Sequence, residues 1–143
     1  MYLTDAPIHL GRFFDFTLAP SSGALNFFVG IVRDEDHGKR VKKLIYECYP
    51  SMAERMIGNL IAEAKKCWPI QEIRVLHRTG DLAIGDVAVV VAVSSKHRDE
   101  AISACRFMIE GIKSKVPIWK KQFFLDGTHE WVLCAHAKES TLV

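Results

Sequence analysis

The segment VAVVVAVS, residues 87–94, restricts the fold more than any other part of the sequence. It is almost wholly apolar and rich in valine, and the turn-forming pair Gly85-Asp86 precedes it. A strand without polar alternation is typical of the centre of a sheet, where both faces are covered. We therefore expect this segment to be a central strand that marks the core of the domain.

Other segments also have strand patterns. Residues 23–33, GALNFFVGIVR, are rich in β-branched and aromatic residues, and residues 41–49, VKKLIYECY, alternate with period two. We expect these two strands to pair antiparallel. IRVLHR, residues 73–78, reads as a further strand, and near the C-terminus IWKKQFFL and HEWVLCAH flank Asp126-Gly127, which predicts a hairpin.

Two helices are expected. The first begins with the S-x-x-E pattern of a capping box, from Ser51 to Glu54, and ends at a Trp-Pro pair. The second covers about residues 95–113, with Pro117 beyond its end. The predicted class is α+β with strands in the majority, in a single domain over residues 1–143.

Charge and cysteine content exclude some functions. The 19 Lys and Arg residues against 17 Asp and Glu give a net charge of +2, too small for a protein that holds nucleic acid mainly through phosphates. The cysteines form no C-x-x-C pair and have no histidine at ligand spacing, so no metal site is expected. We expect all four to be small buried hydrophobes: Cys48, Cys67, Cys105 and Cys134. No run of eighteen apolar residues and no export signal is present, so we expect a cytoplasmic protein.

Basic residues open the second predicted helix. Lys96, His97 and Arg98 lie where free backbone N–H groups already make the positive end of the helix dipole. A bound phosphate or carboxylate would stabilise this arrangement. Alternatively, Asp99 and Glu100 neutralise the turn and the basic side chains point into water.

A second basic group lies in IKSKVPIWKK, residues 112–121. Lys113 ends the helix, Lys120 begins the next strand, and Pro117 forces a bend that could bring both amines to one pocket. Lysines are also favourable at a helix C-terminus, and Lys115 and Lys121 could be surface charges, so spacing does not decide.

Two strand ends carry further candidates. Arg33 is placed to face a ligand but could instead pair with Asp34 or Glu35 on the surface. His77 and Arg78 have the same ambiguity, and for His77 a core or supporting role is favoured over catalysis. Phosphate-binding, dinucleotide-binding, zinc-protease and serine-hydrolase motifs are all missing.

Several short motifs, taken in order, resemble the large, catalytic subunit of molybdopterin synthase. The motifs are F-V-G-x-V-R (28–33), Y-P-x-M (49–52), W-P (68–69), H-R-x-G-x-x-x-x-G-D (77–86), H-R (97–98) and K-x-x-x-P-x-W-K (113–120). The resemblance implies an α/β-hammerhead-like fold with an additional antiparallel β-sheet. It also implies a sulfurtransferase of molybdenum cofactor biosynthesis, which converts cyclic pyranopterin monophosphate to the molybdopterin dithiolene.

The resemblance implies partners as well. The sulfur arrives as the C-terminal Gly-Gly thiocarboxylate of a small ubiquitin-like carrier, and no other cofactor is needed. This chain ends in STLV and therefore resembles the acceptor subunit. Family members form a homodimer with one carrier at each outer end, a heterotetramer.

Site residues follow from the matched motifs. Lys113 and Lys120 match the catalytic lysines, with hypothetical roles in polarising the thiocarboxylate and in proton transfer. Arg33, His97 and Arg98 match substrate-binding positions, and some of them could act across the dimer. Gln122 and Leu133 depart from the pattern because relatives commonly carry acids there.

Two other classes remain open. The basic pocket could belong to a non-catalytic module that binds a ubiquitin-like tail or a phosphorylated small molecule. Single-stranded RNA binding would need exposed aromatic residues beside a broad basic face, which a net charge of +2 disfavours.

Overall fold

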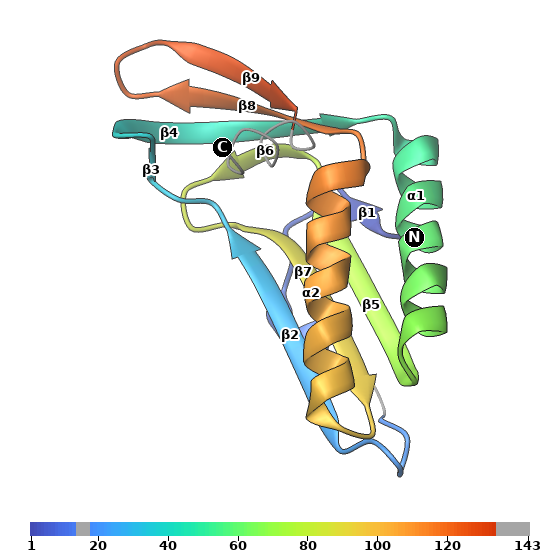
Figure 1. Cartoon of the computed structure of the whole chain (residues 1–143). Coiled ribbons are helices and arrows are strands. Elements are labelled where there is room, and N and C mark those ends of the chain that lie inside the picture. The colour runs from blue at the N-terminus through green and yellow to red at the C-terminus, as the bar shows by residue number, and fades with distance from the viewer. Residues whose placement is uncertain (14–17, 134–143) are drawn as a thin grey trace.

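β7 (Val87–Ser95) is the central strand, as its apolar composition predicts. It pairs antiparallel with β5 (Ile70–Arg78) on one edge and with β2 (Ala24–Ile31) on the other. β1 (Leu3–Thr4) runs parallel to β5, so the strand order is β1-β5-β7-β2. Figure 1 shows these strands in the computed structural model, which describes residues 1–13 and 18–133.

A second sheet, wholly antiparallel, crosses one end of the first (Figure 1). Its order is β3 (Glu35–Asp36), β4 (Lys39–Cys48), β8 (Ile118–Phe124) and β9 (His129–Leu133), and β6 (Gly80–Ala83) also pairs with β4. The sharp turn between β8 and β9 confirms the predicted terminal hairpin.

The predicted pairing of the strands at 23–33 and 41–49 is wrong. β2 pairs along its length with β7, whereas β4 pairs with β6 and β8 in the other sheet. The central strand needs a hydrogen-bonded neighbour on each edge, and β2 provides the second one. A bulge at Gly30/Ile31 and backbone bonds from Val32 to the turn before β7 then direct the chain out of the first sheet.

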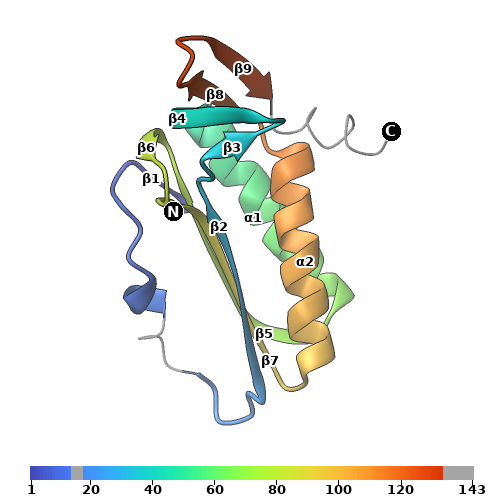
Figure 2. The same ribbon diagram turned by 90° about the vertical axis from the view of Figure 1, so that its left-hand side faces the viewer.

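Both helices cover the same face of the first sheet. α1 (Pro50–Cys67) and α2 (Arg98–Lys115) lie side by side there, and the short 3₁₀ helix η1 (Leu10–Phe13) lies on the opposite face (Figure 2). Phe13 packs with Val90 on that opposite face. The expected coverage of β7 on both faces is therefore confirmed, as is the α+β class with two main helices and an additional antiparallel sheet. Neither helix is long and apolar enough to cross a bilayer, among the residues described.

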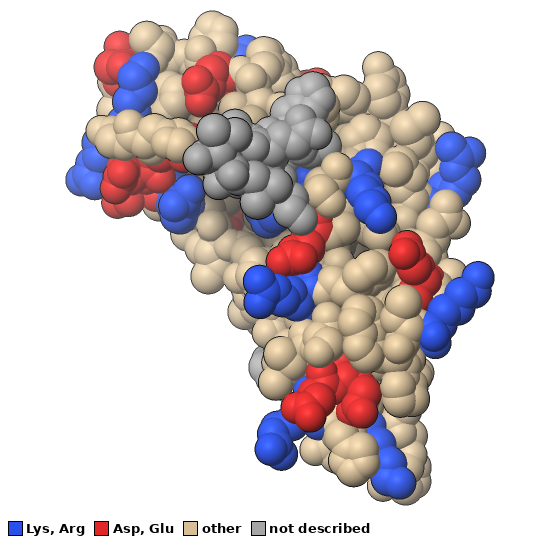
Figure 3. Space-filling view, viewed as in Figure 1, with Lys and Arg blue, Asp and Glu red and all other residues tan. Residues whose placement is uncertain are grey.

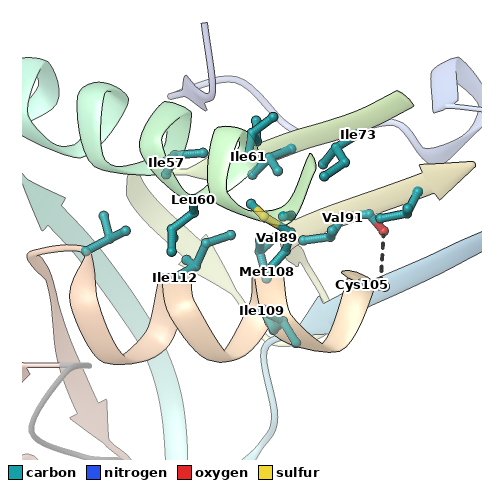
Figure 4. Close-up of a cluster of buried hydrophobic side chains, with 14 of the residues drawn as sticks. Ile57, Leu60, Ile61, Ile73, Val89, Val91, Cys105, Met108, Ile109 and Ile112 are labelled. Carbon is teal, nitrogen blue, oxygen red and sulfur yellow. Dashed lines mark hydrogen bonds between the residues drawn. The ribbon is translucent and has the colours of Figure 1, made fainter. Parts of the chain in front are cut away.

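The main core lies between the helices and β7 (Figure 4). Ile57 and Leu60 of α1 meet Met108 and Ile112 of α2, and all four are almost fully buried. Val91 of β7 completes the layer. This packing fixes the C-terminal end of α2 relative to the sheet, which matters for the site.

Glu54 does not close a capping box. The first helix begins at Pro50 as predicted, but its N-cap residue Tyr49 makes no side-chain capping bond. The Glu54 carboxylate instead accepts hydrogen bonds from the backbone N–H groups of Tyr2 (2.8 Å) and Leu3 (2.9 Å). It thereby ties β1 to α1, a long-range role that a local motif does not reveal.

The expectation that every cysteine is buried is wrong for Cys67, which is exposed in the last turn of α1. Cys105 is buried, as expected, whereas Cys48 is only half-buried. Cys134 lies outside the described residues.

Gly23 should tolerate no side chain. A Cβ atom there would lie 2.2 Å from the backbone oxygen of Lys96, so the turn before α2 would have to move. We expect Gly23→Ala to lower the free energy of unfolding by about 1–3 kcal/mol, measured by urea denaturation. Gly11→Ala is the control, because no atom lies within 4 Å of its added Cβ. Equal losses in the two variants would contradict the explanation.

Candidate functional site

A small cavity lies where the C-terminal end of α2 meets both sheets. Its volume is about 60 Å³, and its walls are mostly apolar side chains of β2, β7, α2 and β8. The described lining contains only three residues with polar side chains, Tyr46, His77 and Lys113. The space therefore suits a narrow ligand with few polar groups.

Lys113 reaches this cavity from the last turn of α2. Ile109 and Ile112 lie on the same side of the helix and also line the cavity. The packed core holds this end of α2 in place, so the base of the Lys113 side chain is fixed. Its position places a cation at an otherwise apolar site.

Lys120 approaches the same region from β8. It is paired directly with Tyr46 of β4, and cross-strand partners have Cβ atoms about 5 Å apart on one face of the sheet. Ile118, two residues earlier and therefore on that same face, lines the cavity. The two lysines matched to catalytic positions thus lie at one place in the fold.

The remaining lysines of the basic stretch lie elsewhere. Lys121 occupies the opposite face of β8, with Nζ 5.0 Å from the ring centre of Phe123 and 5.4 Å from that of Trp131. Lys115 is exposed at the end of α2. Both are the surface charges that the sequence allowed.

His77 is buried and lines the cavity. Its Nδ1 lies 2.7 Å from the backbone oxygen of Arg78, and its ring packs edge to face with Tyr46 at 5.0 Å. Burial lowers the pKa of His77 from 6.5 to about 4, and the charge of Lys113 acts in the same direction. The imidazole is therefore neutral at physiological pH.

This low pKa makes stability depend on pH. In the unfolded chain the His77 imidazole binds a proton near pH 6.5, whereas in the folded chain it does so only near pH 4. The free energy of unfolding therefore falls as the pH drops between these two values. We expect His77 to account for a loss of up to about 3 kcal/mol in the free energy of unfolding at the acid end. The measurement compares urea denaturation of the wild type and His77→Gln from pH 7 to pH 4. An equally steep decline in both proteins would contradict this assignment.

Arg33 follows β2 just beyond the cavity and is largely exposed, with 76% of its side chain accessible. It pairs with Asp36 at 3.6 Å, not with Asp34 or Glu35 as the sequence allowed. Gln122, which is buried, donates a hydrogen bond of 2.7 Å to the same Asp36 carboxylate. The amide of Gln122, where the resemblance implies an acid, thus has a structural role: it holds the carboxylate that faces Arg33.

His97 and Arg98 lie at the opposite end of α2 from Lys113. Both side chains are exposed. Lys113 is the fifteenth residue after Arg98 along α2, which corresponds to a distance of about 22 Å along the helix axis. The structure therefore brings Lys113 and Lys120 together with Arg33 nearby, but one chain does not unite all five candidates.

The sequence did not predict that two aromatic rings line the cavity. No role was predicted for Tyr46, and a core or supporting role was favoured for His77. The cavity forms only where three distant segments meet, so local periodicity does not show it. The H-R-x-G motif was the one signal that pointed to His77.

Other site types lack support in the described residues. No group of three His, Cys, Asp or Glu residues there could hold a metal ion. Burial raises the pKa of the Cys105 thiol, and burial with the Glu54 charge raises that of Cys48. These two thiols are therefore poor nucleophiles at neutral pH.

The fold and the lysine-lined cavity define a known class of protein. The chain belongs to the MoaE family, because the family model described as MoaE protein matches residues 3–115. Proteins named molybdopterin synthase catalytic subunit are similar to it. The one from Halalkalibacterium halodurans is 44% identical over 91% of this chain and 83% of that protein, and the one from Staphylococcus carnosus is 43% identical over 91% and 86%.

Solved structures are similar as well. Molybdopterin synthase from Staphylococcus aureus matches with a TM-score of 0.85 and 37% identity, over 92% of this chain and 95% of that chain. A complex of subunits 1 and 2 of molybdopterin-converting factor from Helicobacter pylori has a TM-score of 0.73 over 92% of this chain and 88% of that chain. At 23% identity, the latter supports the shared fold alone.

Proposed function

We propose that this chain is the catalytic subunit of a molybdopterin synthase, a sulfurtransferase that converts cyclic pyranopterin monophosphate to molybdopterin. The observation that carries the proposal is the narrow apolar cavity lined by Lys113, with Lys120 on the adjoining strand. A thiocarboxylate tail ending in two glycines has no side chains and ends in an anion. A narrow cavity with a cation at its wall suits such a tail.

The two lysines have different roles in this proposal. Lys113 polarises the carbonyl group of the thiocarboxylate and stabilises negative charge on the acyl intermediate. Lys120, on β8, transfers protons at the pterin side chain. The sulfur comes from a small ubiquitin-like carrier, so the chain needs no cofactor of its own, in agreement with the unreactive Cys48 and Cys105 thiols.

Substrate binding involves a second copy of the chain. Arg33, His97 and Arg98 bind the pterin phosphate, and His97 and Arg98 come from the partner protomer because they lie far from Lys113 in one chain. The assembly is a homodimer with one carrier on each protomer, a heterotetramer. We assign it to the cytoplasm.

The face shown in Figure 3 does not favour nucleic acid as the partner. On the face shown in Figure 3, Lys and Arg side chains alternate with Asp and Glu side chains and form no broad basic field. Single-strand binding requires a continuous basic groove with stacking aromatic rings.

Reconstitution tests the proposed function. The purified chain is incubated with cyclic pyranopterin monophosphate and a carrier that ends in a Gly-Gly thiocarboxylate, and product is followed as a fluorescent pterin after oxidation. We expect product with the thiocarboxylated carrier and none with the same carrier ending in a carboxylate. Binding of the carrier without any product would support the non-catalytic module instead.

A further inference from the structure

The hydrogen bond of His77 fixes which ring nitrogen carries the proton. A backbone carbonyl oxygen can only accept, so Nδ1, 2.7 Å from the Arg78 oxygen, must be the donor. The neutral ring then has its lone pair on Nε2, on the other side of the imidazole. The low pKa of about 4 keeps the ring in this state at neutral pH.

Among the described residues, the hydrogen bond of the His77 ring is the one made by Nδ1. The ring lines the cavity, as does Lys113. Because the ring lines the cavity, a ligand that supplies a donor can hydrogen-bond to Nε2 and gain affinity there. The cavity therefore presents a cation and a neutral acceptor among apolar walls.

We propose that His77 is a specificity-determining residue: its Nε2 accepts a hydrogen bond from the backbone N–H of the last residue of the entering peptide tail. Lys113 contacts the anionic end of the same residue. The last residue of a peptide chain carries both a backbone N–H donor and an anionic end, which matches this pair of groups. This inference rests on the proposed function, because it assumes that a carrier tail enters the cavity.

N-methylation of the tail's last glycine tests the hydrogen bond, because it removes the donor and leaves the anion. The probe is the carrier with an ordinary Gly-Gly carboxylate, or the same carrier with N-methylglycine at its end, and calorimetry gives Kd. We expect the methyl group to weaken binding to the wild type about 10-fold.

Two variants at position 77 provide the comparison. His77→Asn keeps a donor for the Arg78 carbonyl but removes the acceptor, so N-methylation should weaken its binding less than about 2-fold. His77→Gln places an amide oxygen near the Nε2 position and should recover part of the sensitivity. His77→Leu, which is similar in size to histidine but has no acceptor, separates a steric effect of the methyl group from loss of the hydrogen bond.

Each outcome decides the proposal. An equal fold-change in the wild type and in His77→Asn would overturn it, as would a wild type that does not bind the unmodified carrier. If circular dichroism shows that His77→Asn is unfolded, His77→Leu replaces it under the same criterion. Turnover of the wild type with thiocarboxylated carrier is measured separately, so failure of the proposed function is distinguishable from failure of this hydrogen bond.

Discussion

Lys120→Ala is expected to lower sulfur transfer by at least about 100-fold, the range for loss of a general acid or base. Binding of the carrier should change much less, because the residues that line the cavity remain, including Lys113. The measurements are single-turnover formation of molybdopterin and calorimetric Kd for the carrier in its carboxylate form.

Lys121→Ala is the matched control. It removes the same charge from the next residue of β8, but Lys121 occupies the opposite face of that strand, over Phe123 and Trp131. We expect its rate to stay within about 2-fold of the wild type, as for a change away from the reacting groups. Normal turnover in Lys120→Ala, or an equal loss in Lys121→Ala, would contradict the proposed role of Lys120.

The elements of the fold were largely predictable, but their pairing was not. The valine-rich pattern of β7 shows that this strand is central, because burial on both faces leaves a signal in the sequence itself. Which strand pairs with β2 leaves no such signal. Whether β2 pairs with β7 or with β4 depends on which of these two strands has an edge without a hydrogen-bonded neighbour in the assembled sheets.

The site was predictable to a similar degree. Lys113 lines the cavity and Lys120 pairs with Tyr46 beside it, as the bend at Pro117 allows, and their joint action in one site stays a prediction. His97 and Arg98 could not be placed from the sequence motifs alone, because α2 separates Arg98 from Lys113 by about 22 Å within one chain. The sequence favoured a core or supporting role for His77, and only the three-dimensional arrangement shows that its buried ring also lines the cavity.

The second large effect is expected when two inactive variants are mixed. If the partner protomer supplies His97 and Arg98, a complete site combines the lysines of one chain with the basic pair of the other. A heterodimer of Lys120→Ala and the double variant His97→Ala/Arg98→Ala then has one site with both lesions and one intact site. Random exchange of subunits should therefore restore about a quarter of the wild-type activity, since half of the dimers are mixed and each has one working site of two.

A second mixture provides the control. Lys113 and Lys120 lie in one chain's cavity region, so a heterodimer of Lys113→Ala and Lys120→Ala has a lesion in each site and should stay inactive. Native mass spectrometry verifies that subunits have exchanged in both mixtures. Recovery in the first mixture alone would place His97 and Arg98 across the dimer. If activity does not return in fully exchanged dimers, His97 and Arg98 do not complete the partner's site. Within a single chain these two residues lie far from Lys113, at the other end of α2.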